Sequence, residues 1–115
     1  MCEYGDVYYA KLPEKQNSRV QQGVRPVLIV SNNKANCYSP VITVIPLTTS
    51  ETKRNLPTHV TISGDGLTDK SIALVEQITA FDKVNLIEKV CSLARTSKMN
   101  EINRAIGIQL ALNAS

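Results

Sequence analysis

Short apolar runs separated by polar segments fill most of the chain, a pattern typical of β-strands joined by turns. The apolar runs predict strands at residues 7–12, 24–30, 41–48, 59–62 and 71–81. Polar residues fill the segments 14–22, apart from Val20, and 50–55, and we expect both segments to be loops. The first loop is longer than the ~4–6 residues that usually join two elements, and long loops in small domains often carry function.

Prolines and glycines divide these runs further. Proline has no backbone N–H to donate to a neighbouring strand, so Pro26 is expected at the start of its strand or on an edge of the sheet. Residues 31–36 are expected to form a turn or a short helical turn. Two glycines around an aspartate predict a turn at residues 64–66.

The end of the chain carries a helical pattern. Thr96 or Ser97 can cap a last helix, and Asp82 is placed to cap a shorter one that runs through Ile87. The apolar residues of the last helix fall largely at steps of three and four, namely Met99, Ile102, Ala105, Ile106, Leu110 and Leu112. Several strands followed by a helix indicate an α+β fold that is mainly β, with a coiled antiparallel sheet and without alternating β-α-β units.

The composition indicates one folded domain over residues 1–115. Hydrophobic residues make up 43% and charged residues 20%, which is globular and not disordered. The net charge of +3 is compatible with an anionic partner but is only weakly basic. With one Phe, four Tyr and no Trp, the chain has few aromatic platforms on which bases could stack. Any role in RNA binding must therefore rest on a local groove.

The sequence also bears on location. It contains no apolar run of the ~18–20 residues that a membrane span needs, so no membrane association is expected. The acidic N-terminus lacks the basic and apolar regions of a signal peptide. Three scattered cysteines argue against a disulfide framework and against a zinc site, so we expect a reduced protein of the cytoplasm. Cys37 and Cys91 are expected to be small buried packing residues.

Standard catalytic motifs are missing, since the chain has no phosphate-binding glycine-rich loop, no zinc-ligand spacing and no nucleophile elbow. A single histidine, His59, excludes a mechanism with two histidines, and a structural or surface role is favoured for it over a general base. Glu76 lies in an apolar run, where a carboxylate needs a partner. A salt bridge or a dimer contact is favoured for Glu76, ahead of a catalytic acid.

The most suggestive polar residues stand at the ends of expected strands. Arg25 lies where the long loop meets an apolar strand, and Thr48 and Thr49 end another strand. Arginine presents a planar set of donors that matches a phosphate, and a threonine hydroxyl can add one hydrogen bond. Alternation places Thr48 and Thr49 on opposite faces, so Thr49 is the weaker candidate. Taken alone, such residues are more often ordinary surface and strand residues.

Several short segments follow one another in a specific order along nearly the whole chain. They are residues 5–8 (GDVY), 23–30 (GVRPVLIV), 39–40 (SP), 44–48 (VIPLT), 56–60 (LPTHV) and 76–78 (EQI). No single segment is decisive, but the ordered set resembles the MazF/PemK family of bacterial toxins, especially the MazF toxins of Gram-positive bacteria.

This resemblance implies the CcdB/PemK-like fold, an SH3-like coiled antiparallel barrel with a C-terminal helix, usually assembled as a homodimer. It implies a ribosome-independent endoribonuclease that cuts single-stranded mRNA at a short sequence, without a metal or other cofactor, and so inhibits translation and growth. The 2′-hydroxyl attacks its own phosphodiester and leaves a 2′,3′-cyclic phosphate and a 5′-hydroxyl. A cognate antitoxin similar to MazE, with an extended acidic tail in the RNA groove, is also implied.

The family's catalytic arginine and Ser/Thr correspond to Arg25 and Thr48. Arginine is a poor general base, so Arg25 is assigned first to phosphate stabilisation and only second to proton transfer, and the identity of the general base stays open. Family position and base-edge chemistry make four side chains candidates for RNA contact: Arg19, Gln21, Gln22 and Gln77. Gln22 replaces the first of two family glycines, and Thr79 stands where the family often has arginine. Both departures bear on the recognised RNA sequence more than on the activity.

Two other functions fit the same sequence. A CcdB-like toxin shares the fold but would poison a topoisomerase through C-terminal helix residues without enzymatic activity, because a fold does not determine a function. A small SH3-like adaptor without activity would also show mild charge and few aromatic residues. The intact Arg25 and Thr48 pair argues against the CcdB-like function, whereas a neighbouring gene for a small acidic protein would count against the adaptor.

Overall fold

The computed structural model describes residues 1–49 and 56–112, so the loop expected at residues 50–55 lies outside the described part. The elements along the chain are β1 (Asp6–Leu12), β2 (Gly23–Ile29), α1 (Asn33–Tyr38), β3 (Val41–Thr48), β4 (His59–Ile62), β5 (Ser71–Leu74), the 3-10 turn η1 (Val75–Gln77), β6 (Thr79–Asp82), the 3-10 turn η2 (Lys83–Asn85), β7 (Leu86–Ser92) and α2 (Lys98–Gln109). The first four expected strands and the short helical turn after the second strand are confirmed.

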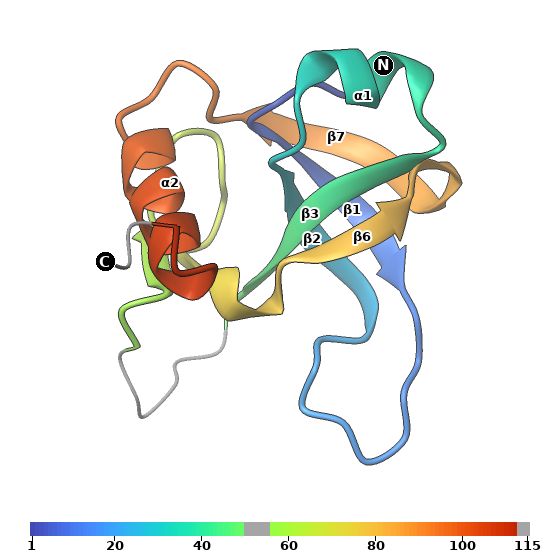
Figure 1. Ribbon diagram of the computed structural model, residues 1–115, viewed down its shortest axis with the longest axis horizontal. Coiled ribbons are helices and arrows are strands. Elements are labelled where there is room, and N and C mark those ends of the chain that lie inside the picture. Colours follow the sequence, from blue (N-terminus) through green and yellow to red (C-terminus); the bar gives the residue numbers. More distant parts are fainter. Residues whose placement is uncertain (50–55, 113–115) are drawn as a thin grey trace.

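The strands form one antiparallel sheet in the order β4-β5-β3-β2-β1-β7, and β6 pairs with the first half of β3. The two ends of this path, β4 and β7, do not pair with each other within the described residues, so the sheet coils without closing. Figure 1 shows α2 at one side of the coiled sheet and the loop between β1 and β2 projecting from its end. The expected α+β fold, mainly β with a C-terminal helix, is confirmed.

Both strand prolines lie where their strand has a neighbour on one side only. β2 pairs with β1 from Gly23 to Leu28, but its pairing with β3 begins at Val27, one residue after Pro26. In β3, Pro46 falls between the stretch paired with β6, which ends at Val44, and the stretch paired with β5, which begins at Leu47. A proline lacks the N–H donor that a second neighbour needs. The expected edge position of Pro26 is therefore confirmed.

The prediction of one strand over residues 71–81 is wrong, because this run forms two strands separated by η1. β5 pairs with the end of β3 and with β4, whereas β6 pairs with the start of β3. The two strands thus lie in line along one edge of β3, and η1 carries the chain from one to the other. A run of apolar residues indicates that a segment is buried, but not that it forms one uninterrupted strand. The order of apolar and polar residues could therefore not locate the turn η1. The break places Glu76 and Gln77 on a turn instead of a strand.

The helix expected after Asp82 is also wrong in extent, since it is only the single turn η2. Asp82 holds the N-cap position, but its side chain makes no capping hydrogen bond. Ile87 belongs to β7, a strand that the pattern did not predict. The pairing of β7 with β1 shifts register twice, and every residue of β7 is exposed or half-buried. Such bulges break the alternation that identifies a strand in a sequence.

The last helix is confirmed at Lys98–Gln109 and closes one end of the core. Met99, Ile102 and Ala105 are buried, and α2 packs on β4 and η1. The helix ends before Leu110 and Leu112, which are 51% and 67% exposed and so do not extend its buried face as expected. Ser97 is the N-cap without a side-chain capping bond. Neither of the two α-helices in the described residues is long and apolar enough to cross a membrane.

The cysteines are free thiols in three different surroundings. Cys37 is exposed on α1, which contradicts its expected burial, because this short helix buries only Asn36 fully. Cys91 is half-buried and Cys2 is buried. Burial raises the pKa of the Cys2 and Cys91 thiols above the ordinary value, so both thiols stay protonated at neutral pH.

Gly5 ties the N-terminal segment to the sheet and to the turn before α2. Its N–H donates to the Ile29 carbonyl at 2.8 Å, its carbonyl accepts from Leu93 at 2.7 Å, and its φ is +87°. A Cβ at this position would lie 2.6 Å from the Ala94 Cα. We expect Gly5→Ala to lower the free energy of urea unfolding by about 2–5 kcal/mol, since backbone strain and a backbone clash add. Gly64→Ala, at φ +77° with open space around it, should cost only about 1–2 kcal/mol, and equal losses would contradict the clash.

Candidate active site

A pocket of about 230 Å³ lies where the ends of several strands meet the long loop. It is lined by Arg19, Gln21, Arg25, Thr48, His59, Leu74, Glu76 and Gln77. These residues come from the loop after β1, from β2, from the end of β3, from β4, from β5 and from η1. Five of the six predicted site residues are therefore brought together, and the remaining one, Gln22, does not line the pocket.

Arg25 brings a fixed positive charge to this pocket. It lies on β2 opposite Ala10 of β1, and its Nε donates to the Gln22 carbonyl at 3.1 Å. The Arg25 side chain is exposed and forms no ion pair with any carboxylate in the described part of the chain. Because the Nε bond anchors the stem of the guanidinium, the terminal nitrogens can present their donors to an anion.

Thr48 lies across the pocket at the end of β3. It pairs with Ile72 of β5 and is only 5% exposed. The following residue, Thr49, is exposed and does not line the pocket. The expectation from alternation that Thr49 faces away from the site is therefore confirmed.

Glu76 and His59 form a hydrogen-bonded pair in the same pocket. His59 Nε2 lies 2.8 Å from Oε2 of Glu76, and the hydroxyl of Thr58 donates to the other carboxylate oxygen at 3.2 Å. The side chain of His59 is 9% exposed and that of Glu76 is 28% exposed. Glu76 thus has the partner that a carboxylate in an apolar run needs, although η1 and not a strand carries it, and the alternative of a dimer contact stays a prediction.

Two glutamines shape the long loop beside the pocket. Gln77 Oε1 accepts from the Gln21 N–H at 2.8 Å, and its Nε2 donates to the Arg19 carbonyl at 3.5 Å. Gln22 closes the loop on itself, because its amide bonds both the N–H and the carbonyl of Lys15. The loop that carries Arg19 and Gln21 is thus shaped by side chains that were predicted to contact RNA.

Two residues of this pocket, His59 and Glu76, received too little weight from the sequence pattern, which favoured structural roles for them. His59 and Glu76 stand 17 residues apart and join Arg25 and Thr48 only through the pairing of β4, β5 and β3. The signals available were a lone histidine at a strand start and a glutamate inside an apolar run. Neither signal specifies a partner, so the sequence could not show that a carboxylate lies near the arginine.

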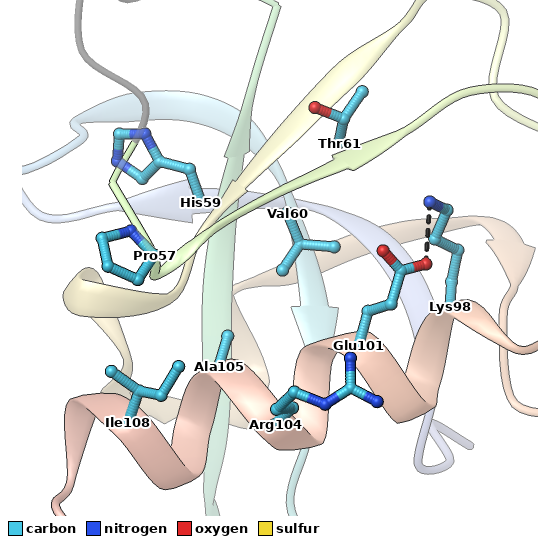
Figure 2. A pocket seen from close by; sticks show the side chains of 9 residues that line it. All are labelled: Pro57, His59, Val60, Thr61, Lys98, Glu101, Arg104, Ala105 and Ile108. Carbon is cyan, nitrogen blue, oxygen red and sulfur yellow. Dashed lines mark ion pairs between the residues drawn. The ribbon is translucent and has the colours of Figure 1, made fainter.

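A second pocket, of about 330 Å³, lies between β4 and α2. Figure 2 shows the side chains of Glu101 and Lys98 joined as an ion pair on α2, with Arg104 one turn along the helix. The Nζ of Lys98 lies 2.9 Å from Oε2 of Glu101, so these two charges offset each other, and Arg104 adds one positive charge to the pocket. His59 lines both pockets.

Comparison with known proteins places these features in a family. A family model described as PemK-like, MazF-like toxin of type II toxin-antitoxin system matches residues 3–110. Proteins named Endoribonuclease MazF from Staphylococcus epidermidis and Staphylococcus saprophyticus are each 44% identical to this chain, over 98% of the chain and 94% of the relative.

Solved structures agree with this assignment. An endoribonuclease from a mycobacterial species, in complex with its cognate antitoxin, is 29% identical with a TM-score of 0.78, over 97% of both chains. MazF from Deinococcus radiodurans is 19% identical with a TM-score of 0.80 over 96% of both chains, which bears on the fold alone. The chain belongs to the family of PemK-like and MazF-like toxins of type II toxin-antitoxin systems.

Proposed function

We propose that this protein is a toxin that cleaves single-stranded RNA at a short sequence, without a metal ion. The pocket that gathers Arg25, Thr48 and Glu76 is the observation that carries the proposal. It combines a fixed cation, a hydroxyl and a carboxylate, the groups needed to stabilise a phosphoryl transfer and to accept a proton. Staphylococcal relatives named Endoribonuclease MazF, at 44% identity, support the same activity.

The proposed reaction is the one that the resemblance to the MazF/PemK family implies, and the groups of the pocket suit it. The 2′-oxygen of one nucleotide attacks the adjacent phosphorus while the bond from phosphorus to the 5′-oxygen breaks. The 2′-hydroxyl gives up one proton and the leaving 5′-oxygen takes one up from solvent, so the products are a 2′,3′-cyclic phosphate and a 5′-hydroxyl. Extra negative charge develops on the phosphoryl oxygens, where Arg25 and Thr48 donate hydrogen bonds.

Glu76 is the group that we assign to accept the 2′-hydroxyl proton. An arginine stays protonated and cannot serve well as a base, whereas a carboxylate can. Each oxygen of Glu76 receives one hydrogen bond, from Thr58 and from His59, which leaves further lone pairs for a substrate hydroxyl. This assignment names the proton acceptor that the residue pattern alone left open.

RNA contact is proposed for the loop and for η1. The side chains of Arg19 and Gln21 line the pocket and make no hydrogen bond to other described residues, so they are available to a phosphate or a base edge. In the protein without RNA, the side chains of Gln22 and Gln77 form hydrogen bonds to the loop backbone. When RNA binds, each side chain replaces these bonds with hydrogen bonds to RNA. The identity of the recognised bases depends on these four side chains.

Partners are proposed on the same basis. We propose a homodimer in the cytoplasm and an antitoxin whose acidic tail occupies the groove beside Arg19 and Arg25. A solved endoribonuclease of a mycobacterial species is described in complex with its cognate antitoxin, which supports an antitoxin as the partner. The CcdB-like alternative is not favoured, because the named relatives are endoribonucleases.

The test is to incubate the purified protein with a long single-stranded RNA in EDTA and to map the new ends. We expect cuts at one short sequence, with cyclic phosphate and 5′-hydroxyl ends. No cutting, or cutting only after a metal is added, would overturn the proposal. Growth arrest that survives Arg25→Ala but is lost on truncation after Ala111 would instead point to a topoisomerase target.

Thr48 offers a matched pair of variants with its neighbour. Thr48→Val keeps the shape of the buried side chain but removes the hydroxyl, and we expect it to slow cleavage about 100-fold, the usual cost of one preorganised donor. Thr49→Val, at an exposed position outside the pocket, should cleave at the normal rate. Initial rates on a fluorescent RNA measure both, and equal rates for the two variants would remove Thr48 from the mechanism.

A further inference from the structure

The carboxylate of Glu76 is held from both sides by consecutive residues of another segment. Thr58 donates to Oε1 at 3.2 Å and His59 Nε2 lies 2.8 Å from Oε2. Thr58 is buried, and the side chain of His59 is 9% exposed. A carboxylate with both oxygens tied to buried groups has little freedom to rotate, so its remaining lone pairs keep one direction.

The other ring nitrogen of His59 determines which tautomer is present. Nδ1 is buried and has no hydrogen-bond partner among the described residues. A proton on Nδ1 would be an N–H group without an acceptor, which is more costly than an unpaired lone pair at the same place. The proton of neutral His59 therefore belongs on Nε2, where Glu76 accepts it.

The same geometry excludes His59 as the base itself. Nε2 already faces Glu76, and Nδ1 is closed off from solvent and so from a substrate hydroxyl. A general base must reach the proton that it removes. The role left to His59 in this site is to orient the carboxylate of Glu76.

We propose that His59 is a positioning residue, whose Nε2–H aims the carboxylate of Glu76 at the 2′-hydroxyl of RNA bound beside Arg25 and Thr48. The inference rests on the proposed function, because it takes Glu76 as the proton acceptor. It predicts that His59 acts on the chemical step through Glu76 and not on RNA binding. Loss of His59 should then lower kcat and leave KM nearly unchanged.

The experiment combines His59→Ala and His59→Gln with Glu76→Gln in a double-mutant cycle. His59→Ala should lower kcat about 10- to 100-fold, the loss typical when a partner that orients a site group is removed. His59→Gln restores an amide N–H near the place of Nε2 and should recover most of the rate. In the Glu76→Gln background, His59→Ala should cause little further loss, because its route of action is gone.

Three outcomes would overturn the inference. They are an equal loss from His59→Ala in both Glu76 backgrounds, no loss in either, and a His59→Gln variant as slow as His59→Ala. Binding of an RNA with a 2′-deoxy nucleotide at the cut site, together with thermal unfolding, checks that each variant is folded. If His59→Ala does not fold, Thr58→Val removes the other carboxylate bond and enters the same cycle.

The result also separates this inference from the proposed function. A wild-type protein that cuts no RNA overturns the proposed function, and the inference with it. A wild-type protein that cuts RNA and is inactivated by Arg25→Ala, but not slowed by His59→Ala, overturns the inference alone.

Discussion

Arg25→Ala will slow RNA cleavage by at least about 100-fold while the protein stays folded, because a preorganised donor aimed at developing negative charge is worth that much or more. The side chain is exposed and its only hydrogen bond within the described residues goes to the Gln22 carbonyl, so its loss removes little packing. Initial cleavage rates at saturating RNA give the size of the effect, and thermal unfolding verifies the fold.

Arg104→Ala is the matched control for this variant. Arg104 is also an exposed arginine, but it lies on α2 in the second pocket (Figure 2) and does not line the pocket of Arg25. Arg104→Ala lowers the net charge by the same amount as Arg25→Ala. Because Arg104 does not line the pocket of Arg25, this variant should leave the cleavage rate almost unchanged. If the two variants lose activity equally, overall charge and not the position of Arg25 supports cleavage.

Glu76→Gln should lower kcat about 100- to 10,000-fold, the range that a positioned general base contributes. The amide keeps the shape of the side chain and can still accept the hydrogen bond of His59, but it cannot take a proton at neutral pH. RNA binding should persist, since the variant removes a negative charge from a pocket that binds an anion. Rates on a cleavable RNA and the affinity for its 2′-deoxy analogue measure the two effects separately.

Glu101→Gln provides the control for the loss of a carboxylate. Glu101 pairs with Lys98 on α2 and does not line the pocket of Arg25. We expect normal cleavage from it. A Glu76→Gln variant that cuts RNA as fast as Glu101→Gln would show that another group accepts the proton.

The order of apolar and polar residues was sufficient to predict those parts of the fold that depend only on neighbouring residues in the sequence. β4 was predicted from alternation at His59–Ile62, and the position of Pro26 followed from its missing N–H. The pattern failed where pairing departs from regular alternation. β7 carries two register shifts against β1, and the run over residues 71–81 is cut by η1. Bulges and turns within apolar runs depend on which strands lie alongside, and a sequence pattern does not contain that information.

The sequence by itself determined the residue types and the strand ends that carry Arg25 and Thr48, because strand periodicity and the family pattern are both local properties. The tertiary structure alone decided that Glu76 and His59 face the same pocket. Their contact spans 17 residues, and the contact of Gln77 with the loop at Gln21 spans 56. The contact between His59 and Glu76 depends on the pairing of β4 with β5, and the contact of Gln77 with the loop depends on the pairing of β3 with its neighbours β5 and β2. The group that we propose as proton acceptor is therefore positioned by the sheet and not by any one segment.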